Sequence, residues 1–140
     1  MGIKQYLKQA FTIDRFIKAK KTRIQYLKDQ LEWLGSLPTN TKVQVNAPKD
    51  RLGDTVAVLL DAIVDTEREI KRLADLQQDI AELIAKVEQG DLQLVLYERY
   101  VNFKKWEDIA MDNNYSAKHV LKLHGKALRA VSEKWILNDT

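Results

Sequence analysis

The chain has 140 residues, of which 45% are apolar and 31% are charged, with a formal net charge of +3 and no cysteine. This composition excludes a disordered chain, and it also excludes disulfides, thiolate zinc sites and cysteine nucleophiles. No apolar run approaches the about 20 residues of a membrane span, and no signal-peptide core is present, so we expect a cytoplasmic protein without a membrane partner. Only two prolines and five glycines interrupt a sequence rich in helix formers, which predicts an all-α fold.

The first predicted element is a long amphipathic helix over residues 3–34. Its apolar residues recur every three or four positions, the period of a helix that buries one face. Gly35 is expected to end this helix, and residues 35–53, which hold both prolines, are expected to form a loop that moves or contacts a partner. The apolar stripe consists of Ile3, Leu7, Ala10, Ile17, Ile24, Leu27, Leu31 and Leu34.

A second long helix is predicted to follow Asp54, whose side chain can cap it. At 1.5 Å per residue it would be about 50 Å long, and it must cover its apolar stripe with a partner. Residues 1–53 hold eleven Lys/Arg against four Asp/Glu, whereas residues 54–90 hold four against nine. This opposite charge favours an antiparallel hairpin over residues 1–90, with a coiled-coil homodimer through the same stripe as the competing arrangement. The stripe consists of Val56, Leu59, Ile63, Ile70, Leu73, Ile80, Ile84 and Val87.

A domain boundary is predicted at Gly90 and Asp91, because glycine can end one helix and aspartate can cap the next. Residues 91–140 then form the second domain, which divides into three helices. The first is strongly apolar, from residue 92 to residue 101. The second is short, from Trp106 to Asp112, and the third follows Ser116.

The spacing of the last two helices is typical of a helix-turn-helix. Asn113-Asn114 can make the turn, since asparagine tolerates the left-handed conformation, and Ser116 can cap the helix that follows. Ile109 and Val120 are expected to meet between the crossing helices. Ala110 lies where the two backbones approach, and a small side chain is needed there.

The third helix also has an unusual charge pattern. Residues 115–129 contain four basic residues and no acidic residue. At about 100° per residue these four lie within about 80° of one another on the helix. A solvated face normally mixes signs to gain i,i+4 pairs, whereas four like charges attract phosphates. We therefore expect a DNA-facing surface, with a merely solvated face as the alternative. The four residues are Lys118, Lys122, Lys126 and Arg129.

Specific roles follow from the way a helix-turn-helix binds DNA, with the first turns of its second helix in the major groove. Lys118 and Lys122 can donate to guanine acceptors, and Ala117 or Leu121 can touch a thymine methyl group. The basic residues at either end of the motif are expected to meet phosphates. The predicted DNA contacts are Ser116, Ala117, Lys118, His119, Leu121, Lys122, Lys126, Arg129, Lys104 and Lys105.

The two histidines, His119 and His124, are five residues apart, outside the i,i+4 spacing that joins two metal ligands on one helix face. We expect no metal, with His124 packed at the helix interface and His119 facing a phosphate. The sequence contains no Gly-rich phosphate loop, activated nucleophile or carboxylate pair in a plausible cleft. We therefore predict that the protein is not an enzyme and that it has no cofactor.

The C-terminal residues resemble phage-encoded regulators of the ArpU/RinA type, whose helix-turn-helix is similar to region four of bacterial sigma factors. The opening GIKQYLKQAFTID and the two long helices are also similar to such proteins. One departure is that Asn113-Asn114 stands where the family has an apolar residue followed by a small one, so an apolar contact is lost. The matching residues are Leu96, Arg99 and Tyr100; Trp106, Ile109 and Ala110; Tyr115 and Ser116; His124, Ala127 and Leu128.

The resemblance implies a sequence-specific transcriptional regulator, an activator of phage late or packaging genes that acts on double-stranded DNA in the bacterial cytoplasm and nucleoid. Its long helices would form a homodimer or contact host RNA polymerase. Two alternatives remain open from the sequence. One is a DNA-packaging initiation protein like a small terminase subunit, and the other is an adaptor whose basic helix meets an acidic protein partner.

Overall fold

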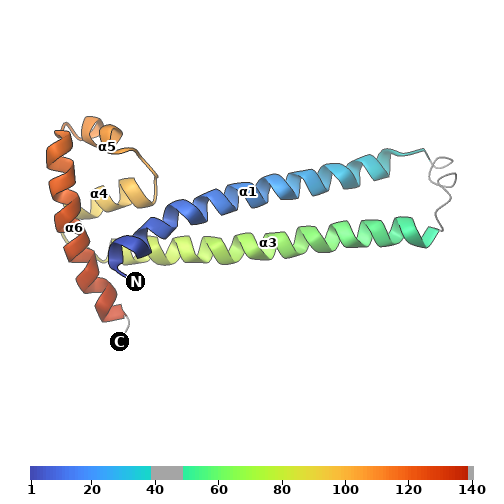
Figure 1. The fold of residues 1–140 in the computed structure, drawn as a ribbon, viewed down its shortest axis with the longest axis horizontal. Helices are drawn as coiled ribbons and strands as arrows, with labels where there is room; N and C mark the ends of the chain where they lie inside the picture. Colours follow the sequence, from blue (N-terminus) through green and yellow to red (C-terminus); the bar gives the residue numbers. More distant parts are fainter. Residues whose placement is uncertain (39–48, 139–140) are drawn as a thin grey trace. The chain divides into compact units, whose positions relative to one another are not determined.

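The computed structural model describes residues 1–38 and 49–138. Within these residues every regular element is a helix, so the predicted all-α class is confirmed (Figure 1). No described helix is both long enough and apolar enough to pass through a lipid bilayer. The helices are α1 (Ile3–Ser36), α3 (Lys49–Ala85), α4 (Gly90–Tyr100), α5 (Trp106–Asp112) and α6 (Ala117–Asn138).

The chain divides into two compact units. The hairpin unit is Phe16–Leu73, and the head unit combines Met1–Arg15 with the chain from Ala74 onward. Each of the long helices α1 and α3 therefore contributes to both units. The predicted domain boundary falls at the start of α4, but the head unit also includes the first turns of α1 and the last turns of α3. A separate domain over residues 91–140 stays a prediction.

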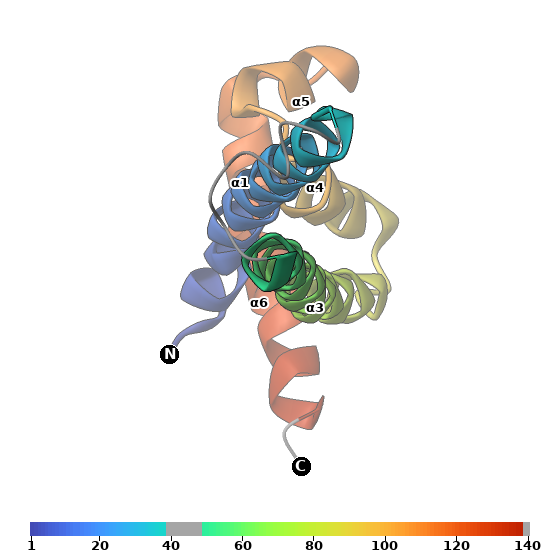
Figure 2. The ribbon, with the colours of Figure 1, turned by 90° about the vertical axis from the view of Figure 1, so that its right-hand side faces the viewer.

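The hairpin unit is held together by apolar contacts between α1 and α3. Ile24 and Leu27 of α1 form a buried cluster with Ile63 of α3. Lys20 forms an ion pair with Glu69, and this hydrogen bond and charge hold the pKa of Glu69 below its usual value. The paired residues rise in number on α1 as they fall on α3, so the two helices run antiparallel, side by side in Figures 1 and 2. A helical hairpin and pairing of opposite charge are both consistent with the sequence prediction.

The start of α3 differs from the prediction. The helix begins at Lys49, so Asp54 lies inside it, and the prediction that Asp54 caps it was wrong. The apolar stripe of α3 includes Leu52, which is half-buried. Burial of this side chain favours a helix that begins before Asp54. Gly53 does not adopt a positive φ, and a single glycine costs a helix only about 1 kcal/mol. Gly35 and Ser36, also predicted to lie in the loop, are the last residues of α1, so Gly35 does not end that helix, and residues 39–48 lie outside the described residues.

The junction between α3 and α4 also differs. Helix α3 ends at Ala85 and Gly90 is already the first residue of α4, so Gly90 does not end the preceding helix. Asp91 lies in the first turn of α4, where the helix dipole favours a carboxylate, and it is not the capping residue. The side-chain amide of Gln93 donates hydrogen bonds to the carbonyl oxygens of Ala85 at 3.0 Å and Val87 at 3.1 Å. This amide satisfies carbonyls at the end of α3, so no glycine is required there.

The core of the head unit takes side chains from every helix. Helix α6 packs against both α4 and α5. At its far end Trp135 stacks on Tyr6 of α1, with ring centroids 5.3 Å apart. This arrangement fixes the orientation of α6 about its axis, and with it the face that α6 turns outward. The buried apolar residues include Leu7, Ala10, Ile13, Ile80, Leu83, Ile84, Val87, Leu92, Val95, Leu96, Tyr100, Ile109, Ala110, Val120, Leu123, Ala127 and Val131.

Candidate nucleic-acid interface

The turn between α5 and α6 has the predicted chemistry. Asn114 adopts the left-handed conformation with φ of 57°. The Tyr115 amide donates to the carbonyl oxygen of Ala110 at 2.8 Å. The Ser116 hydroxyl oxygen accepts a hydrogen bond from the His119 amide at 3.1 Å, so Ser116 caps α6 as predicted. These contacts fix the angle at which α6 leaves the short helix.

The contact between α5 and α6 is apolar, as predicted. Ile109 and Val120 are fully buried and belong to one cluster with Ala110. Trp106 and Tyr115 pack around this cluster. Burial of side chains of this size stabilises a fold by about 1.5–3 kcal/mol each, so the pair of helices is firmly joined.

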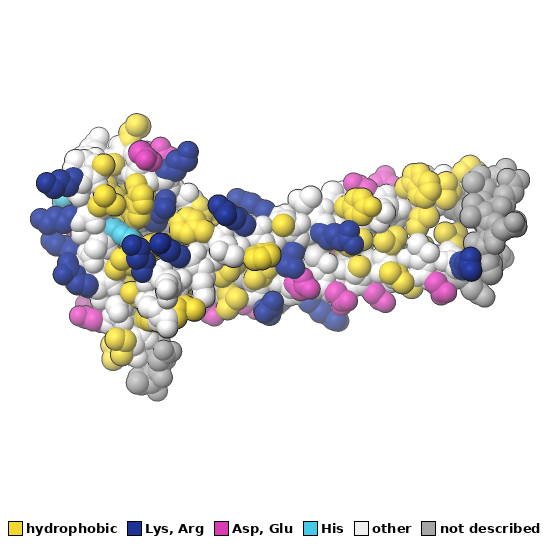
Figure 3. Space-filling model, viewed as in Figure 1, with side chains coloured by type: hydrophobic (Ala, Val, Ile, Leu, Met, Phe, Trp, Pro, Cys, Tyr) yellow, Lys and Arg dark blue, Asp and Glu magenta, His cyan; other side chains and the backbone are white. Residues whose placement is uncertain are grey.

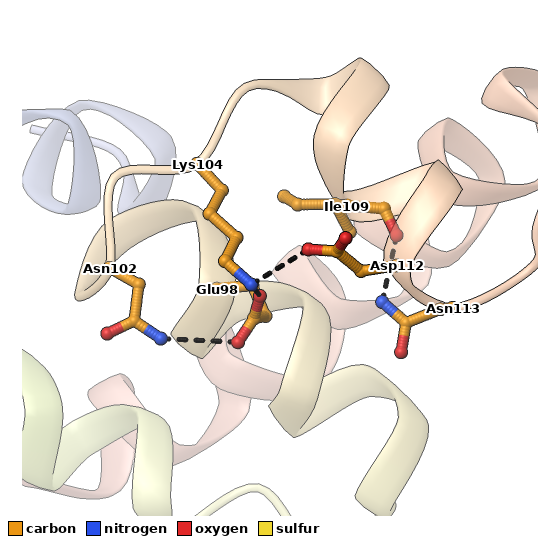
Figure 4. Close-up of polar contacts among 6 residues, drawn as sticks. All are labelled: Glu98, Asn102, Lys104, Ile109, Asp112 and Asn113. Carbon is orange, nitrogen blue, oxygen red and sulfur yellow. Dashed lines mark hydrogen bonds and ion pairs between the residues drawn. The ribbon is translucent and has the colours of Figure 1, made fainter.

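Asn113 has a structural role that the sequence did not reveal. Its side-chain amide donates to the carbonyl oxygen of Ile109 at 2.8 Å, at the end of α5 (Figure 4). The same carbonyl oxygen also accepts the backbone N–H of Asn113 at 3.2 Å, so Asn113 holds the end of α5 through two hydrogen bonds. A polar residue therefore fits at this position although it loses the apolar contact expected from the ArpU/RinA resemblance.

Lys104, a predicted DNA contact, is engaged by the protein itself. Its ammonium group forms ion pairs with Glu98 of α4 and, at 3.0 Å, with Asp112 at the end of α5 (Figure 4). The hydrogen bond to Glu98 is the main cause of a raised pKa of Lys104, and the hydrogen bond to Asp112 raises this pKa further. Lys104 therefore joins α4 to α5, and we do not retain it as a phosphate contact. Its neighbour Lys105 is exposed and has no ion-pair partner in the described part of the chain.

The four basic residues of α6, which we call the basic face, are all exposed (Figure 3). None of them forms an ion pair with a carboxylate of residues 1–38 or 49–138. Their charge is therefore not neutralised by a neighbouring side chain. The row of Lys and Arg side chains over α6 is visible at the left edge of Figure 3. The basic face comprises Lys118, Lys122, Lys126 and Arg129.

Most of the other predicted DNA contacts are also exposed. Ala117 lies in the first turn of α6 and is exposed, and Leu121 is 55% exposed. His119 is exposed, and its ring meets the edge of the Tyr115 ring at a centroid distance of 4.8 Å. Ser116 is exposed, although its hydroxyl oxygen is occupied by the cap. The first two turns of α6 thus present one continuous outward surface.

His124 is buried, and its predicted place at the helix interface is confirmed. It is only 7% exposed and lies 2.8 Å from the hydroxyl oxygen of Tyr100. The edge of the Trp106 ring packs against it, with centroids 4.6 Å apart. Burial, and then the charges of Lys4, Arg99 and Lys8, lower the pKa of His124 to about 4. His124 is therefore neutral at pH 7.

Lys4 and Lys8 of α1 were not assigned to the interface from the sequence. Both are exposed, and both act electrostatically on His124 in the same unit. A signal was available, because the first 13 residues contain no Asp or Glu and the two lysines are four apart. That i,i+4 spacing repeats the spacing of Lys118 and Lys122.

Among the described residues no group of three or more His, Cys, Asp or Glu side chains is arranged to hold a metal ion. Comparison of the chain with protein-family models, with curated proteins and with solved structures found no match. The resemblance to ArpU/RinA regulators therefore stays a prediction.

Proposed function

We propose that this chain is a sequence-specific DNA-binding transcriptional regulator of the phage type, which reads a duplex with the helix-turn-helix formed by α5 and α6. The resemblance to ArpU/RinA regulators makes activation of late or packaging genes the specific form of the proposal. Double-stranded DNA is the proposed partner, and no cofactor is needed.

The observation that carries the proposal is the exposed, unneutralised basic face of α6, next to a turn with helix-turn-helix contacts. A surface helix gains from mixed charge through i,i+4 pairs, yet Lys118, Lys122, Lys126 and Arg129 find no carboxylate among the described residues. Four like charges on one face repel each other, and the phosphates of a duplex relieve that repulsion. Release of counterions from those phosphates then adds to affinity.

The roles of the residues differ along α6. Lys118 and Lys122, in its first two turns, are proposed to donate to guanine acceptors in the major groove. Leu121 offers an exposed apolar side chain to a thymine methyl group. Lys126 and Arg129 lie farther along and are proposed to hold phosphates, which sets register without reading sequence.

The exposed apolar side chains of the hairpin unit favour a second binding partner. Large apolar side chains of α1 and α3 are exposed there, including Trp33 at 62% and Val58 at 66%. Exposed apolar side chains of this size mark protein contact surfaces when they are contiguous. A second copy of the chain or host RNA polymerase is the proposed partner, and light scattering on a sizing column separates a homodimer from a monomer.

The test is duplex binding measured by fluorescence anisotropy as salt is raised. The target duplex is first selected from a random-sequence pool with the protein itself, and its scrambled version is the comparison. We expect log affinity to fall linearly with log salt. Replacing Lys118 or Lys122 by Ala is expected to weaken binding to the selected duplex by at least about 1 kcal/mol each, with a smaller loss on the scrambled duplex.

Lys28→Ala is the matched control, because Lys28 is an exposed lysine of the hairpin unit outside the proposed interface. Equal losses on selected and scrambled duplexes would show that Lys118 and Lys122 touch only phosphate. Absence of salt-sensitive duplex binding in the wild-type protein would instead favour the adaptor with an acidic protein partner. A ring of about eight or more subunits on the sizing column would favour the small-terminase alternative.

A further inference from the structure

A small pocket opens in the head unit, beside α6 and between its neighbours. It has a volume of about 220 Å³. The aromatic rings of Phe11, Tyr100 and Trp106 form part of its wall, and the exposed Leu121 of α6 also lines it. Three cations reach it from two different helices: Lys4 and Lys8 from α1 and Arg99 from α4. Among the residues that the structure describes, no carboxylate lines it.

Arg99 is held rigidly in this pocket. Its guanidinium lies 4.5 Å from the centre of the Trp106 ring and 4.9 Å from that of Phe11. One of its nitrogens donates to the carbonyl oxygen of Lys104 at 2.9 Å. No carboxylate of the described residues forms an ion pair with it. A half-buried guanidinium with its orientation fixed and its charge unmatched is ready to bind an anion.

The positive charges of Lys4, Lys8 and Arg99 all act on the interior of the pocket. Burial and their positive charges together disfavour protonation of His124, which lines the pocket. His124 is neutral at pH 7 and does not supply a fourth charge, and its Nε2 is engaged by Tyr100. An anion in the pocket would therefore meet two ammonium groups and one guanidinium.

The size of the pocket restricts its ligand. Sites for whole small molecules are about 300–1,000 Å³, so about 220 Å³ suits a single oxyanion group better than a metabolite. Leu121 indicates where that group comes from. It is three residues after Lys118, which places it about 60° away around α6, so the pocket adjoins the basic face. A phosphate of DNA bound along that face lies within reach of the pocket.

We propose that Lys4, Lys8 and Arg99 form a phosphate-binding pocket that holds one backbone phosphate of the duplex bound along α6. The proposal depends on the proposed function, because it names the DNA as the source of the phosphate. It extends the interface from the helix-turn-helix to the first turns of α1. Contacts of this kind fix register and do not read sequence.

The experiment compares the wild-type protein with Lys4→Ala/Lys8→Ala and with the control Lys21→Ala/Lys28→Ala. The control removes the same charge from the same helix at exposed positions of the hairpin unit. Anisotropy is measured on the selected and scrambled duplexes between about 50 mM and 200 mM salt. We expect the slope of log affinity against log salt to become less steep by about 0.9 for each phosphate lost. This change should appear in Lys4→Ala/Lys8→Ala alone, with an unchanged ratio of selected to scrambled affinity.

Two results overturn the pocket while leaving the proposed function intact. In the first, Lys4→Ala/Lys8→Ala has the same slope of log affinity against log salt as the wild-type protein, while Lys118→Ala still weakens binding to the selected duplex. The other is an equal change in the Lys21→Ala/Lys28→Ala control, which would mean that net charge alone matters. Failure of the proposed function looks different, because the wild-type protein then shows no salt-dependent binding.

A second measurement separates the two sources of phosphate. Inorganic phosphate is titrated into the wild-type protein and the indole resonance of Trp106 is followed by NMR. A shift that disappears in Lys4→Ala/Lys8→Ala, together with a changed DNA slope, supports a DNA phosphate. The same shift with an unchanged DNA slope overturns the proposal in favour of a free phosphate ligand.

Discussion

The hydroxyl oxygen of Tyr100 lies 2.8 Å from Nε2 of His124, and both side chains are buried. The pair connects α4 to α6 beneath the proposed DNA-binding surface. Burial raises the pKa of Tyr100, and burial with three nearby cations lowers the pKa of His124 to about 4. Both groups are therefore uncharged at neutral pH, and the hydrogen bond between them is sensitive to acid.

Stability is expected to fall as pH is lowered below 6.5. The unfolded chain protonates His124 with its usual pKa of 6.5, whereas the folded chain resists protonation down to about 4. The unfolded state therefore binds more protons in this window, and stability rises with pH across it by up to about 3 kcal/mol. Urea unfolding of the wild-type protein and His124→Gln, from about pH 7.5 to about pH 4.5, measures this. An identical pH slope in both proteins between pH 6.5 and 5 would contradict the assignment.

Lys104 and Lys105 are adjacent in sequence, yet we expect their substitutions to have opposite effects. Lys104→Gln breaks the ion pairs with Glu98 and Asp112, so it should lower the urea midpoint and leave the salt slope of duplex binding unchanged. Lys105→Ala should leave stability unchanged. If Lys105 holds one phosphate, its loss makes the salt slope less steep by about 0.9. The reverse pattern would show that Lys104 is the DNA contact.

Asn114 is expected to tolerate only residues that accept a left-handed backbone. Its φ is 57°, where a β-branched side chain is strongly disfavoured. Asn114→Val should lower the free energy of unfolding by about 1–2 kcal/mol, while Asn114→Gly should be neutral or slightly stabilising. Chemical denaturation distinguishes the two variants. Equal stability of both would mean that the turn rearranges without cost.

Gly125 lies in the middle of α6, where a glycine lowers helix stability. An added Cβ would meet no heavy atom within 4 Å in the described structure, so Gly125→Ala should raise the free energy of unfolding by about 0.5–1 kcal/mol. Gly90→Ala, at the first residue of α4, is the control and should have a smaller effect because it is at a helix end. Lower stability of Gly125→Ala would indicate an unrecognised contact at this position. Weaker duplex binding by a more stable Gly125→Ala would show that DNA approaches the α6 backbone there.

Local patterns in the sequence were sufficient for the short helix α5 and for the turn that follows it. Short α5 was predicted with its observed bounds, since Trp106 and Asp112 bracket a periodic segment between loop residues. The cap at Ser116 and the left-handed Asn114 also follow from the chemistry of single residues. Such features depend on neighbours within four residues, and one sequence contains that information.

Features that depend on distant residues were missed. Lys104 was predicted to contact DNA, but it lies between α4 and α5, and its partners Glu98 and Asp112 come from these two helices. Gly90 was predicted to end the preceding helix, but the side chain of Gln93, which lies on α4, donates hydrogen bonds to carbonyl oxygens at the end of α3. The proposed phosphate pocket is lined by residues of α1, α4, α5 and α6, and no local pattern predicts that these residues come together.

The stack of Tyr6 on Trp135 has a practical consequence for anyone who expresses this protein. It joins the first turn of α1 to the last turns of α6, so removal of either segment breaks this contact. A fragment that starts at the predicted boundary would lose Tyr6, and with it the partner of Trp135. Shortened versions should therefore retain both Tyr6 and Trp135.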